Sequence, residues 1–109
     1  MALTVYVDFE GDLRPSAGSP VRVEARDTSL ADAKPEVVGQ ANGEVVAGIG
    51  SRLAVLQVAL TRRPVTSTLW AHVDTDRDGR VSKGDLITTE SFPIPSQDNA
   101  ELTVRVRLV

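Results

Sequence analysis

The sequence contains no cysteine among its 109 residues. Disulfide frameworks, thiolate metal sites and thiol nucleophiles are therefore excluded. Aromatic residues are scarce as well, at 4% of the chain, so valine, leucine and isoleucine must fill any hydrophobic core. A chain of this length can bury such a core without disulfide bonds, and we expect one domain over residues 1–109.

Two further absences exclude broad classes of function. The formal net charge is -3, so the chain lacks the basic surface with which proteins hold a nucleic acid backbone. The longest apolar run, residues 53–60, is much shorter than the roughly 20 residues that span a bilayer, and no signal peptide is visible. We expect the chain as given to be soluble. A place in the cell envelope or outside the cell would require that a leader had been removed.

Apolar and polar residues alternate in several short segments, which is the period-two pattern of strands with one buried face. Turn residues such as glycine and proline separate these segments. In the last segment, Leu102, Val104, Val106 and Leu108 are expected to face one way. The predicted strands with this pattern cover residues 3–10, 21–26, 68–74, 86–94 and 100–109.

Three other segments are less regular. Residues 51–61 are almost wholly apolar, which predicts a strand in the middle of a sheet with both faces covered, and a helix is the competing interpretation. Residues 36–46 contain paired valines around Gly39 and an Asn42-Gly43 step, typical of either a bulged strand or a tight hairpin. Between residues 27 and 35 we expect a short connection.

About seven short strands without a convincing helix predict an all-β protein. The fold we expect is an antiparallel β-sandwich, in which two sheets of immunoglobulin-like or transthyretin-like arrangement share one core.

Residues 74–85 read DTDRDGRVSKGD and have the spacing of a calcium loop. Ca²⁺ takes about six to eight oxygen ligands, and a loop of this length supplies them from fixed positions around a central glycine. Gly79 occupies that glycine position, and Val81 is the expected apolar anchor. The predicted Ca²⁺ ligands are the side chains of Asp74, Asp76, Asp78, Ser82 and Asp85 and the carbonyl of Arg80.

This loop resembles those of EF-hands and, because it ends in aspartate, looks most like those of dockerin domains. The flanking residues have strand patterns, so a paired EF-hand domain is not expected. The alternative is a plain polar turn at Asp78-Gly79. Repulsion among the aspartates favours a bound cation, although Arg77, Arg80 and Lys83 could partly neutralise them. Mg²⁺ is less favoured, because its octahedral shell usually keeps several waters.

No pattern of catalytic residues stands out. The single histidine, His72, is expected to be an exposed strand residue rather than part of a catalytic dyad, and no phosphate loop or zinc-spaced pair is present. We therefore expect the protein not to be an enzyme. Arginines at residues 22 and 26 and at residues 105 and 107 would form an anion-docking patch only if their two strands were neighbours.

The segments VRVEARDTSLADA (21–33), TLWAHVDTDRDGRV (68–81) and TTESFPI (88–94) together resemble small β-sandwich lipoproteins related to the type III secretion pilotins. This resemblance implies a noncatalytic, envelope-associated protein that assembles or stabilises another protein. It carries over no functional residue. The chain departs from the family in having no lipid-bearing cysteine and in having a fuller acidic turn.

Two functions follow from these patterns. The first is a noncatalytic calcium-binding module with a structural or protein-interaction role. The alternative is a pilotin-like assembly factor or chaperone of the bacterial envelope that does not depend on metal.

Overall fold

The computed structural model describes residues 2–28, 36–61, 66–95 and 97–109. These residues form eight β-strands. The strands are β1 (Ala2–Glu10), β2 (Pro20–Asp27), β3 (Glu36–Glu44), β4 (Arg52–Leu60), β5 (Ser67–Val73), β6 (Leu86–Thr88), β7 (Phe92–Pro93) and β8 (Ala100–Leu108).

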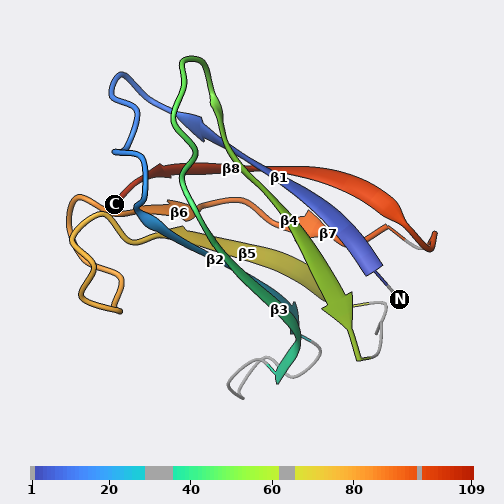
Figure 1. The fold of residues 1–109 in the computed structure, drawn as a ribbon. Helices are drawn as coiled ribbons and strands as arrows, with labels where there is room; N and C mark the ends of the chain where they lie inside the picture. Colours follow the sequence, from blue (N-terminus) through green and yellow to red (C-terminus); the bar gives the residue numbers. More distant parts are fainter. Residues whose placement is uncertain (1, 29–35, 62–65, 96) are drawn as a thin grey trace.

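Seven of these strands close into a barrel. They pair in the order β2-β3-β4-β1-β8-β6-β5, and β5 pairs back onto β2 to complete the ring. Figure 1 shows the strands wrapped around one interior. The predicted immunoglobulin-like or transthyretin-like β-sandwich is therefore wrong. Alternation along a strand shows only that one face is buried, and a closed barrel buries one face of every strand just as a sandwich does.

The first and last strands are neighbours and run in the same direction. Leu3 on β1 lies opposite Ala100 on β8, and the parallel register continues to Glu10 opposite Arg107. The other strand pairs of the barrel are antiparallel. The predicted wholly antiparallel arrangement is therefore also wrong, because the first and last strands along the chain, β1 and β8, form a parallel pair (Figure 1).

Valine and leucine side chains fill the barrel interior. The alternation predicted for 3–10, 21–26, 68–74 and 100–109 is confirmed as strand, except that Leu108 is 70% exposed at the end of β8. The fully buried aliphatic residues include Leu3, Val5, Val7, Val21, Val23, Val38, Leu53, Val58, Val73, Val104 and Val106.

Residues 51–61 form a strand, as expected, but only one of its faces is covered. Val55 on the outer face of β4 is 51% exposed, whereas Val58 is fully buried. The prediction that both faces are covered is wrong because no second layer packs over the outside of a barrel.

β3 is a single bulged strand, so the hairpin alternative for residues 36–46 is wrong. Its register with β2 shifts between Ala25 and Arg26, which face Gly39 and Val37 respectively. β3 then meets β4 over two residue pairs only. A Cβ atom at Gly39 would lie 2.7 Å from the carbonyl oxygen of Ala59, so the approach of these backbones requires glycine.

Two other predictions concern segments of the chain between the longer strands. The strand predicted at 86–94 is divided into β6 and β7. Most of the connection predicted at 27–35 lies outside the described residues.

The anion-docking patch required that the strands carrying its arginines be neighbours. β2 and β8 are separated in the barrel, so their arginines do not form this patch. Within the described ranges, no helix has the length and apolar character needed to cross a bilayer.

Candidate functional site

The acidic loop, residues 74–85, joins β5 to β6 at one end of the barrel. Both of its ends are held by backbone hydrogen bonds. The amide of Asp74 donates to the carbonyl of Pro20 at 2.9 Å, and the amide of Val109 donates to the carbonyl of Asp85 at 2.8 Å. The loop is thereby fixed to the start of β2 and to the end of the chain.

Asp85 is the buried anchor of this loop, with a fully buried side chain. Its Oδ2 accepts a hydrogen bond from Nε2 of His72 at 2.8 Å and one from the amide of Ser82 at 3.2 Å. Its Oδ1 accepts from both the amide and the hydroxyl of Thr75, each at 3.0 Å. Burial favours the neutral acid, yet these bonds outweigh it and lower the pKa of Asp85 below its usual value.

His72 is therefore not the exposed strand residue that the sequence predicts. It is 2% exposed and pairs with Asp85, which lies just before the adjacent strand β6. The alternation of β5 cannot reveal this pair, because it depends on the register between two strands. His72 and Asp85 together hold the acidic loop against the barrel.

Four carboxylates of the loop lie close together. Asp74, Asp76, Asp78 and Asp85 each offer an oxygen, and these atoms all lie within 4.8 Å of one another. The sequence spacing predicted this grouping, and the structure brings the four side chains together. Asp76 and Asp78 are exposed, whereas Asp74 is 7% exposed and Asp85 is fully buried.

Short hydrogen bonds orient three of these carboxylates. Asp74 Oδ2 accepts from the amide of Gly79 at 2.8 Å, and Gly79 has a φ of 78°, which favours glycine. Asp78 Oδ1 accepts from the amide of Arg80 at 2.9 Å. Asp76 Oδ2 accepts from the hydroxyl of Ser82 at 2.7 Å, and this bond contributes most to lowering the pKa of Asp76.

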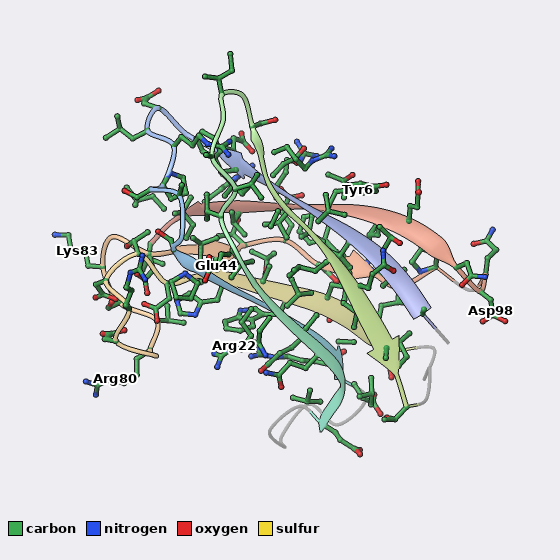
Figure 2. The ribbon with its side chains drawn as sticks, in the orientation of Figure 1. Tyr6, Arg22, Glu44, Arg80, Lys83 and Asp98 are labelled. Carbon is green, nitrogen blue, oxygen red and sulfur yellow. The ribbon has the colours of Figure 1, made fainter. Side chains whose placement is uncertain are left out.

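The loop's described basic residues form no ion pair with these acids. Arg80 and Lys83 point outward from the loop (Figure 2). Among the described residues, no lysine or arginine forms an ion pair with any of the four aspartates. The expected apolar anchor, Val81, is 44% exposed and does not enter the core.

An apolar pocket of about 450 Å³ lies at the same end of the barrel. It brings together side chains from β1, the following loop, the acidic loop, β6 and β8. Thr75 and Gly84 of the acidic loop form part of its wall. Sequence reasoning missed this pocket because its lining residues are far apart along the chain. The apolar lining residues are Phe9, Leu13, Pro15, Leu86 and Leu108.

Arg14 holds the loop that forms one side of this pocket. Its guanidinium donates to the carbonyls of Val46, Gly50 and Arg52 at 2.5, 3.0 and 2.8 Å. These bonds connect the β1–β2 loop to the β3–β4 loop and to the first residue of β4. Leu13, next to Arg14, is 87% exposed.

No protein-family model matches this sequence, and no curated protein matches it. Among solved structures, an alternative pilotin from the type II secretion system of Vibrio cholerae superposes with a TM-score of 0.72. The alignment covers 100% of this chain and 96% of the pilotin chain, at 17% sequence identity. The fold is similar to that of a pilotin.

The similarity concerns the fold of the whole chain. The sequence resemblance was to type III secretion pilotins, and the structural neighbour is a pilotin of a type II system, so the pilotin-like part of the prediction is supported at the level of fold. The comparisons do not address metal binding. Calcium binding by residues 74–85 therefore stays a prediction.

Proposed function

We propose that this protein is a noncatalytic, pilotin-like assembly factor or chaperone of the bacterial envelope, and that it acts by binding a protein partner. The observation that carries this proposal is the similarity of fold to a secretion pilotin along the entire chain. A fold alone does not determine function, so the proposal also needs a surface that suits a partner.

The apolar pocket at the barrel end supplies such a surface. Leu13 and Leu108 line it and are 87% and 70% exposed. Exposed apolar side chains gathered around a concave site are typical of surfaces that bind other molecules. We infer that an apolar segment of the partner enters this pocket.

The surroundings of His72 support a noncatalytic role. The chain has one histidine, and its Nε2 is hydrogen-bonded to the buried carboxylate of Asp85. A general base must reach the proton that it removes from a substrate. His72 is 2% exposed, so it is poorly placed for that task and serves the loop instead.

Binding to a purified secretion-channel component from the same organism tests this proposal. Leu13→Asp and Leu108→Asp should each weaken binding about tenfold or more, since central apolar contacts usually dominate an interface. Val55→Asp is the matched control, because Val55 is exposed on the outer face of β4 and does not line the pocket. Affinity is measured by calorimetry after circular dichroism has confirmed that each variant is folded.

The proposal predicts that the control binds as the unaltered protein does. Failure of the unaltered protein to bind the component would contradict the proposed function. Equal binding by all three variants would reject the pocket as the docking surface. Partner binding should persist in a chelator, because the proposal assigns no metal to the interface.

A further inference from the structure

We infer that the acidic loop is a Ca²⁺ site in which Asp74, Asp76 and Asp78 are the side-chain ligands and Asp85 is the anchor beneath them. This inference is independent of the proposed partner binding. It also revises the ligand set that the sequence predicts, in which Asp85 coordinates the ion.

The first observation behind it is a buried oxygen without a partner. Asp74 is 7% exposed, and its Oδ1 atom is buried and accepts no hydrogen bond in the described structure. Leaving a buried carboxylate oxygen unpaired is costly unless a cation compensates it. Asp74 also belongs to the group of carboxylates whose oxygens lie within 4.8 Å of one another.

The second observation is that the clustered carboxylates have no ion pair with a described lysine or arginine. The negative charges of carboxylates this close together repel one another and destabilise the folded state, and a nearby cation would reduce this repulsion. The described lysines and arginines form no ion pair with these aspartates. A bound divalent cation would both coordinate Asp74 Oδ1 and neutralise the clustered carboxylates.

The hydrogen bonds of Asp85 explain its different role. Both of its oxygens already accept bonds, from His72, Thr75 and Ser82. A carboxylate has about four lone-pair sites in total, and these contacts occupy them. Asp85 therefore orients the loop, as outer-shell residues do at other metal sites. Water, the carbonyl of Arg80 and the hydroxyl of Ser82 are left to complete the oxygen shell.

The chemistry of the ligands favours Ca²⁺ over other metals. Three carboxylates on one loop suit a large, hard cation with many oxygen ligands, whereas Mg²⁺ usually takes one or two carboxylates and keeps its waters. Zn²⁺, Cu²⁺ and Ni²⁺ are suited by imidazole nitrogen, which none of these three ligands supplies. A second acidic grouping, His72 with Asp74 and Asp85, offers such a nitrogen, but His72 Nε2 already bonds to Asp85.

Titration calorimetry with CaCl₂ on the full chain tests the inference. We expect one ion per chain with a dissociation constant of about 1 mM or lower, and calcium should raise the melting temperature relative to chelator. Asp78→Asn should weaken binding about tenfold or more, since even outer-shell changes commonly cost that much. Asp78 is exposed, so its amide variant should fold.

Glu90→Gln is the matched control, because it removes one exposed carboxylate outside the loop, and calcium affinity should not change. The inference is overturned if millimolar calcium produces neither heat nor a thermal shift. It is also overturned if Asp78→Asn binds as tightly as the unaltered chain, or if Mg²⁺ stabilises the protein as much as Ca²⁺ does. None of these results depends on a protein partner.

Discussion

At the scale of single residues, Asp85 has the most consequential position in the molecule. Its carboxylate is fully buried, and three neighbouring residues donate hydrogen bonds to it. Removing a buried hydrogen-bonded carboxylate leaves the other polar groups without partners in a dry environment. The loop and the end of β5 then lose their shared point of attachment.

We predict that Asp85→Ala lowers the free energy of unfolding by about 3 to 5 kcal/mol, because several buried donors lose their acceptor at once and each unsatisfied donor costs about 1 to 3 kcal/mol. Asp76→Ala, which removes an exposed carboxylate of the same loop, should change it by no more than about 0.5 kcal/mol in chelator. Urea denaturation in chelator measures both values. Equal losses in the two variants would show that Asp85 has no special structural role.

Tyr6 offers a test of electrostatics on the outside of the barrel. Its hydroxyl donates to Oε1 of Glu101 at 3.1 Å, and this bond raises the pKa of Tyr6 above its ordinary value of 10.0. Figure 2 shows Tyr6 on the outer surface. Because the folded-state pKa is raised, the stabilisation is complete below pH 10 and is lost as the pH rises through the folded pKa.

Tyr6 is the one tyrosine in the chain, so the absorbance of tyrosinate reports on it alone. We predict a titration midpoint above 10.0 that falls toward the ordinary value in Glu101→Gln. Glu90→Gln should leave it unchanged. A midpoint that is insensitive to Glu101→Gln would reject the assigned cause.

At the scale of strands, the seam between β3 and β4 is the most restrictive contact. At Gly39 an added methyl group would meet a backbone oxygen at 2.7 Å, whereas at Gly43 it would meet Cδ2 of Leu56 at 2.5 Å. A backbone oxygen cannot move without disturbing its strand, but the end of a leucine side chain can rotate. The two glycines therefore differ in how strictly they are required.

We predict that Gly39→Ala destabilises the protein by about 1 to 3 kcal/mol, as overpacked sites commonly do. Gly43→Ala should cost less, because alanine is intrinsically better than glycine in a strand and Leu56 can adjust. Thermal and urea unfolding of both variants provide the comparison. A larger loss at Gly43 than at Gly39 would contradict this account of the seam.

Sequence patterns predicted most of the strands but not the contacts between them. Alternation located β1, β2, β5 and β8 because it reflects burial of one face, which each strand has wherever its partners lie. The spacing of Asp74, Asp76 and Asp78 predicted their grouping because they are close in the chain. The pairing of His72 with Asp85 could not be predicted in this way, since it requires the register of β5 with β6.

At the scale of the whole molecule, the arrangement of strands was the part that sequence reasoning could not supply. A sandwich and a barrel differ in which strands pair, and the decisive pairs are β2 with β5 and β1 with β8. The second of these joins residues at opposite ends of the chain, Leu3 and Ala100. No local pattern encodes such a contact, and the apolar pocket depends on it because β1 and β8 both contribute to its lining.

The β1–β8 pair also sets the order of events when a ribosome makes this chain. One edge of β1 can dock on β4 after about half of the residues have emerged, but its other edge has to wait for β8. Until then one edge of β1 has unpaired backbone amides and carbonyls. Such an unpaired edge can form β-sheet hydrogen bonds with another chain and so promotes aggregation. Completion of the last strand is thus the step that ends this exposure.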